Sequence, residues 1–132
     1  MIPLISVKDR IELVFSTDND VLKNGSTEDP AQCRAIPLDK AKIRKGGSPL
    51  VATVRPLTSR EAMRVFTDER QSETIFQACD LGTCAIRGEG INAIKPDEVS
   101  STLELLPIAV ISALGAYIIQ ASTEGPENLA KS

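Results

Sequence analysis

The longest apolar pattern in the chain lies near its C-terminal end, where LLPIAVISALGAYIIQAST runs from Leu105 through Thr123 without a charged residue. Apolar side chains recur there at helical spacing, which predicts a helix from about Leu105 to Ala121 with Pro107 in its first turn. Because further apolar residues extend onto its other faces, such a helix must be covered on most sides. The side chains expected to bind a partner are Leu106, Val110, Ile111, Leu114, Tyr117 and Ile118.

Three kinds of cover have to be weighed for this helix: a bilayer, the rest of its own domain, or a second protein chain. Its length approaches the roughly 20 residues that a membrane span needs. Polar residues such as Ser112 and Gln120 interrupt it, and Glu104 and Glu124 flank it in place of basic anchors, which argues against a membrane anchor. Burial in its own domain and burial against another chain, including a copy of itself, both stay open.

Two segments in the first half of the chain have the pattern of β-strands. RIELVF, from Arg10 to Phe15, alternates polar and apolar side chains and predicts a strand. LVATVRPL, from Leu50 to Leu57, is rich in β-forming residues, and Pro56 prevents it from being a central strand over its whole length. The sequence between them is rich in Asp, Asn, Gly, Pro and basic residues, so we expect it to be extended and irregular.

Two shorter helices are expected in the middle of the chain. Thr58 and Glu61 have the spacing of a capping box, in which each side chain binds the backbone N–H of the other, so a short helix should follow Thr58. A second helix is predicted from Ser72 through SETIFQACDLGTCAIRG, because apolar residues as far as Ile86 recur at helical spacing. Gly82 lies on the same face and indicates either close packing or an early end. The next segment, RGEGINAIKPDE, is turn-rich and compatible with a small hairpin.

Together these patterns predict an α+β fold, a small and mainly helical single domain with two or three short N-terminal strands and a long apolar C-terminal helix. Residues 1–57 would form an irregular β-rich part, residues 58–123 a helical part, and residues 124–132 a polar tail. A chain of 132 residues, 42% of them hydrophobic, supplies enough apolar surface for one modest core. Without Trp, that core must be built mainly from Ile, Leu, Val and Ala.

The charge of the chain argues against a dedicated nucleic-acid binder, because the net charge is −3 and backbone binding needs a dense positive surface. One segment is locally basic. Between residues 34 and 60 a single acid, Asp39, is accompanied by Arg34, Lys40, Lys42, Arg44, Lys45, Arg55 and Arg60. This segment is either a loop that touches phosphate or an acidic partner, or a solvated loop balanced by acids elsewhere.

Candidate catalytic chemistry is sparse. The chain has no histidine, which removes the commonest general base and the usual Ser-His and Cys-His nucleophile pairs. Cys79 and Cys84 are too far apart in sequence for a zinc or redox motif, and Cys33 is the remaining soft ligand, so we expect structural thiols in a reducing compartment. The glycines around Gly88 and in RKGGS match no phosphate-binding loop. We therefore expect no catalytic residue, no metal and no cofactor.

The N-terminal segment MIPLISVKDRIELVF lacks the basic start, long apolar run and small-residue cleavage site of a secretory signal. Cytoplasmic synthesis without export is the expectation. The triplet Asn24-Gly25-Ser26 matches a glycosylation sequon, but in that context it is expected to be simply a turn.

The order of these elements resembles the phage tail assembly chaperones. The stretch SPLVATVRPLTSREAMRV is similar to a strand-to-helix transition in that family, in which a basic residue and Pro-Leu-Thr precede a charged helix. The helix that includes residues 73–82, the Gly-containing connector and the final Leu105-Leu106-Pro107 helix, with its polar tail to Asn128, follow in the same order.

This resemblance implies a protein without catalytic activity that acts in bacteriophage tail morphogenesis in the host cell cytoplasm. Its partner would be an aggregation-prone tail component, the tape measure protein or the tail tube protein, which a soluble carrier binds through an exposed apolar surface. The competing interpretation is a structural subunit retained in the virion, in a neck, tail or baseplate ring. Homo-oligomerisation through the last helix is a further arrangement left open, and neither a nucleic acid nor a membrane is expected as a partner.

Overall fold

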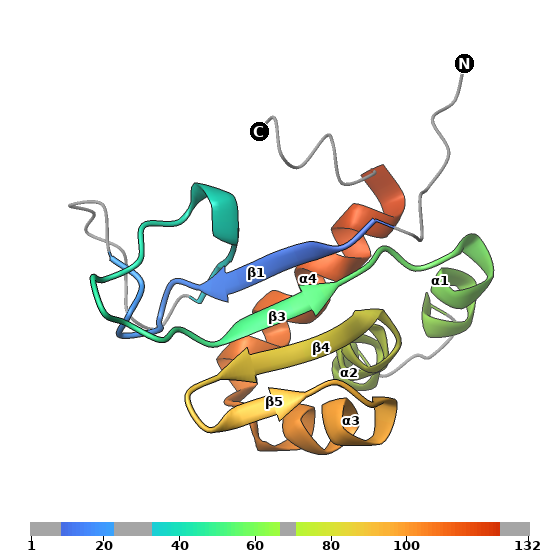
Figure 1. Cartoon of the computed structure of the whole chain (residues 1–132). Coiled ribbons are helices and arrows are strands. Elements are labelled where there is room, and N and C mark those ends of the chain that lie inside the picture. Colours follow the sequence, from blue (N-terminus) through green and yellow to red (C-terminus); the bar gives the residue numbers. More distant parts are fainter. Residues whose placement is uncertain (1–8, 23–32, 67–70, 125–132) are drawn as a thin grey trace.

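The computed structural model describes residues 9–22, 33–66 and 71–124, and in this part of the chain five antiparallel strands form one sheet in the order β2-β1-β3-β4-β5. Figure 1 shows α2, α3 and α4 on one face of the sheet and α1 beside it. The strands are β1 (Ile11–Phe15), β2 (Ala35–Pro37), β3 (Val51–Val54), β4 (Thr83–Gly88) and β5 (Ile91–Ala93). The helices are α1 (Ser59–Phe66), α2 (Gln71–Gly82), α3 (Pro96–Leu105) and α4 (Ile108–Glu124), with a 3-10 turn η1 (Leu38–Lys40). The fold is α+β, as the sequence predicts.

The main core lies between the sheet and the helices. Successive strands align the side chains of Leu13, Ala52, Ile86 and Ala93 in one row, because each faces the next across an antiparallel pair. All four are buried, and they pack in one cluster with the inner sides of α1, α2, α3 and α4. The row shows that strands from both halves of the chain share a single core.

The second expected helix is shorter than the sequence indicates. It ends at Gly82, and Ile86, expected on its apolar face, lies instead in strand β4. Pairing with β3 explains the difference, since Arg55 donates its backbone N–H to the Gly82 carbonyl at 2.8 Å and Ala52 faces Ile86 in the sheet. The helical spacing as far as Ile86 was therefore coincidental. The small hairpin expected in RGEGINAIKPDE is present, since Gly88 of β4 pairs with Ile91 of β5. Both strands lie within residues 58–123, which were predicted to be a helical part.

The last helix also begins later than predicted. Leu105 ends α3, a helix that the sequence analysis did not assign, and α4 begins at Ile108. Leu106 is extended, with φ −75° and ψ 148°, as expected for a residue before proline. The Pro107 carbonyl then accepts the N–H groups of Val110 and Ile111 at 3.0 and 3.1 Å. Pro107 thus separates two helices instead of lying inside the first turn of one.

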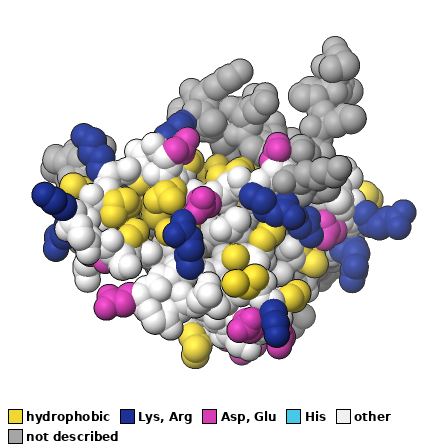
Figure 2. All heavy atoms as spheres, in the orientation of Figure 1, with side chains coloured by type: hydrophobic (Ala, Val, Ile, Leu, Met, Phe, Trp, Pro, Cys, Tyr) yellow, Lys and Arg dark blue, Asp and Glu magenta, His cyan; other side chains and the backbone are white. Residues whose placement is uncertain are grey.

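The opposite face of the sheet is partly covered by the loop that follows β2. Val14 and Val51 point to this face and pack with Val21, Ile36, Leu38, Ala41 and Ile43 in a second, smaller cluster. Figure 2 shows hydrophobic side chains gathered here among charged ones. The Asp18 carboxylate joins the turn after β1 to the end of this loop by accepting the N–H groups of Asp20 and Leu50, each at 2.9 Å. The triplet Asn24-Gly25-Ser26, the N-terminal residues 1–8 and the tail from residue 125 lie outside the described residues.

Candidate functional site

Among the described residues, the most exposed large apolar side chains lie at the corner between α3 and α4. Leu105 is 85% exposed and Ile108 is 84% exposed, and only Leu106 and Pro107 separate them. Leu106 turns the other way and packs against the main core. We call Leu105 and Ile108 the apolar corner. Two exposed aliphatic side chains thus flank Pro107, whose ring fixes its own φ.

The six side chains predicted to bind a partner lie mostly inside the domain. Leu114 and Ile118 are fully buried and Val110 and Ile111 nearly so, while Leu106 and Tyr117 are half-buried. They contact the protein's own core, which is the first of the two kinds of cover that the sequence left open. Partner binding through the four buried residues would require α4 to leave the domain. Self-association through Val110 and Leu114 has the same requirement.

Close contact between α2 and α4 explains this burial. A Cβ placed on Gly115 of α4 would lie 2.6 Å from Cγ2 of Ile75, and one placed on Gly82 of α2 would lie 2.7 Å from Cγ2 of Ile118. Each helix therefore presents a glycine to an isoleucine of the other. The sequence indicated either close packing or an early helix end at Gly82, and the structure shows both. Gly82 ends α2 and also permits the close approach of α2 to α4.

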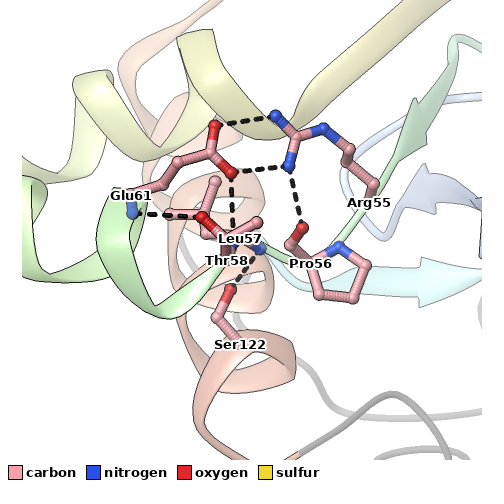
Figure 3. Close-up of polar contacts among 6 residues, drawn as sticks. All are labelled: Arg55, Pro56, Leu57, Thr58, Glu61 and Ser122. Carbon is pink, nitrogen blue, oxygen red and sulfur yellow. Dashed lines mark hydrogen bonds and ion pairs between the residues drawn. The ribbon is translucent and has the colours of Figure 1, made fainter. Parts of the chain in front are cut away.

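The Pro-Leu-Thr motif forms a hydrogen-bonded connection between β3, α1 and α4, shown in Figure 3. Glu61 donates its N–H to the Thr58 hydroxyl at 3.2 Å and accepts the Thr58 N–H at 3.0 Å, which confirms the capping box. The buried Leu57 N–H is donated to the Ser122 hydroxyl of α4 at 2.8 Å. The motif thereby fixes the start of α1 to the end of the last helix.

The same motif contains a partly buried ion pair. Arg55 donates two hydrogen bonds to the Glu61 carboxylate, each 2.9 Å long, and a third to the Pro56 carbonyl at 3.0 Å. The bidentate guanidinium lowers the pKa of Glu61 from 4.5 to about 2, and the Thr58 backbone N–H acts in the same direction. Arg55 is one of the seven basic residues of the 34–60 segment, and its guanidinium is engaged in these contacts within the fold.

The thiols differ in environment. Cys79 is fully buried and donates its Sγ–H to the Ile111 carbonyl at 3.4 Å, and burial raises its pKa to about 12. Cys33 and Cys84 are half-buried. Within the described residues no group of His, Cys, Asp and Glu side chains could hold a metal ion. The core position of Cys79 and its raised pKa make it a poor nucleophile.

Sequence reasoning did not identify the most exposed side chains around the Leu-Leu-Pro segment. It selected the stripe that continues from Leu106, whereas the exposed side chains are Leu105 and Ile108. The available signal was the preference of the residue before proline for an extended conformation. A break at Leu106 leaves Leu105 at the end of one helix and Ile108 at the start of the next.

No family model matches the chain, and no match was found among curated proteins or among solved structures. The similarity to tail assembly chaperones consequently remains one of motif and element order. No helix within the described residues is long and apolar enough to cross a membrane.

Proposed function

We propose that this chain is a non-catalytic bacteriophage tail-morphogenesis protein, a tail assembly chaperone that binds the tape measure protein or the tail tube protein in the host cell cytoplasm. The motifs behind the resemblance are Pro-Leu-Thr and Leu-Leu-Pro. In the structure the first is the connection between β3 and α1, and the second is the junction of α3 and α4. Both motifs thus lie at positions that shape the fold.

The observation that carries the proposal is the apolar corner. A carrier for aggregation-prone proteins needs apolar side chains that are exposed while the carrier itself stays folded. Leu105 and Ile108 meet that requirement, since about five sixths of each side chain is exposed while Leu103 and Val110 beside them are buried. Binding through the corner leaves α4 in place, so the carrier would not have to unfold.

The absence of catalysis is supported by the side-chain chemistry. The whole chain lacks histidine, and its fully buried thiol, Cys79, has a pKa raised to about 12.

The test is affinity capture of the tagged full-length chain from phage-infected cells, combined with mass spectrometry of purified virions. We expect the tape measure or tube protein to be captured by the wild-type chain and lost with the double variant Leu105→Glu/Ile108→Glu. Met63→Glu is the matched control, because Met63 is 68% exposed on α1, away from the corner. Stoichiometric amounts of the chain in mature virions would overturn the chaperone proposal and favour a neck, tail or baseplate subunit.

A further inference from the structure

A basic pocket of about 520 Å³ lies beside strand β2, on a different surface from the apolar corner. Its polar walls come from the residue that precedes β2, from η1 and the loop after it, and from α4. They are formed by Arg34, Lys40, Lys42, Tyr117 and Gln120, and the apolar part of the lining includes Val21, Leu22 and Ile36. We propose that this basic pocket binds an extended, acidic peptide segment of a partner protein. The inference does not rest on the proposed function, because it concerns separate residues and is tested with synthetic peptides.

Strand β2 supplies an edge to which an extended segment could pair. In the part of the chain that the structure describes, it lies at one end of the sheet order and pairs on one side with β1. Ser16 donates its N–H to the Arg34 carbonyl at 2.9 Å, and the Arg34 N–H is donated to the Ser16 hydroxyl at 2.8 Å. Because backbone direction alternates along a strand, the Ala35 N–H and carbonyl and the Pro37 carbonyl turn toward the outer edge, where Pro37 has no N–H to donate. An added strand would bind through such groups.

The charge of the pocket selects for acidic side chains. Three of the side chains that line the pocket are cationic, and none of the described residues that line it is acidic. This concentration contrasts with the net charge of −3 for the whole chain. Arg34, Lys40 and Gln120 already make polar contacts within the chain, so a carboxylate would join or replace those contacts. Complementary charge would accelerate association and set specificity for acidic segments.

Tyr117 adds a hydrogen-bond donor to the cations. A phenol is protonated at neutral pH, and both burial and the nearby Asp39 carboxylate raise the pKa of Tyr117. A protonated phenol can donate to an incoming carboxylate. Tyr117 was predicted to face a partner because of its position on the apolar stripe, and the basic pocket gives it a more specific role.

The backbone that carries Lys42 is held in position before any ligand arrives. Leu22 donates its N–H to the Lys42 carbonyl at 2.8 Å, Arg44 donates its N–H to the Asp20 carbonyl at 2.8 Å, and Val21 forms a β-bridge with Ile43. This part of the basic segment is therefore not a freely solvated loop. A fixed backbone lowers the ordering cost of binding.

The direct test is fluorescence anisotropy of the full-length chain with a labelled peptide of alternating Glu and Val. We expect the same peptide with Gln in place of Glu to bind at least about tenfold more weakly, and binding of the Glu peptide to weaken with added salt. Lys42→Glu should reduce affinity to a similar extent. Lys45→Glu is the matched control, since Lys45 is exposed in the same loop but does not line the pocket. Circular dichroism verifies that both variants are folded.

Three results would overturn the proposal. The Gln peptide could bind as tightly as the Glu peptide, or the two lysine variants could weaken binding equally. A single-stranded oligonucleotide could bind more tightly than the peptide in a Lys42-dependent manner, which would assign the pocket to nucleic acid instead. Strand addition is tested with two Glu peptides N-methylated at alternate residues, one in each register. One of them should lose binding, and unchanged binding by both would contradict pairing with β2.

Discussion

Gly115 of α4 lies against Ile75 of α2 so closely that a Cβ on the glycine would be 2.6 Å from the Ile75 Cγ2 atom and 2.8 Å from its carbonyl oxygen. Contacts this short cannot be accommodated without moving a helix, because one of the two atoms belongs to the backbone. This close approach to α2 helps to hold the helix α4 in the domain. The burial of α4 within the same chain therefore depends on glycine, which has no side chain, at position 115.

Gly115→Ala should destabilise the protein, even though alanine is the better helix former by about 1 kcal/mol. Overpacking of this kind costs about 1 to 3 kcal/mol, so we expect a net decrease in the free energy of unfolding, measured by urea denaturation. Ser112→Ala, at an exposed position of the same helix, is the matched control and should be neutral or slightly stabilising. A Gly115→Ala variant as stable as the wild-type protein would show that the two helices are not closely packed.

Ser122→Ala should lower the free energy of unfolding by about 1 to 3 kcal/mol, since it leaves the Leu57 N–H buried without its acceptor. The Ser122 hydroxyl also donates to the Ile118 carbonyl at 2.6 Å, so its removal eliminates both contacts. The comparison with Ser112→Ala in the same denaturation experiment isolates the effect of the hydrogen bonds from that of the substitution. Equal stability of the two variants would contradict a role for the Pro-Leu-Thr motif in holding α4.

Glu61 should make stability depend on pH in the acid range. Its folded pKa of about 2 lies below the ordinary value of 4.5, so the ionised carboxylate stabilises the protein above pH 4.5 and this contribution is lost as the pH falls toward 2. Glu61→Gln should cost about 1 to 2 kcal/mol at neutral pH and flatten the dependence of the free energy of unfolding on pH in that window.

Arg55→Gln should remove most of the same pH dependence, because Arg55 is the main cause of the lowered Glu61 pKa. The double variant should then cost less than the sum of the two single variants. Additive costs, or an unchanged slope between pH 2 and 4.5 in either single variant, would show that the ion pair does not form in solution.

Cys79 should resist alkylation in the native protein. Its thiol is buried and its pKa is raised to about 12, so little thiolate exists at neutral pH. Iodoacetamide labelling followed by peptide mass spectrometry should modify the half-buried Cys33 and Cys84 first and Cys79 only after denaturation. Labelling of Cys79 at the rate of the other two would indicate that α2 and α4 separate readily.

Local signals in the sequence were the ones that predicted structure correctly. The strand from Arg10, the strand from Leu50 and the capping box at Thr58 each depend on a few neighbouring residues, and the structure confirms them. Strand β4 was missed because its position is set by pairing with β3, which is distant in sequence. The basic pocket was not predictable for a similar reason, since Lys42 and Tyr117 meet only when α4 packs beside β2.

The central claim is that the apolar corner keeps a tail protein soluble. The most direct measurement is the soluble fraction of a tape measure protein that is co-expressed with this chain. The tape measure protein is to be the one encoded in the same genome as this chain. We predict that wild-type chain and Met63→Glu raise that fraction, while Leu105→Glu/Ile108→Glu, although folded, does not. No increase with the wild-type chain, or an equal increase with the corner variant, would contradict the claim.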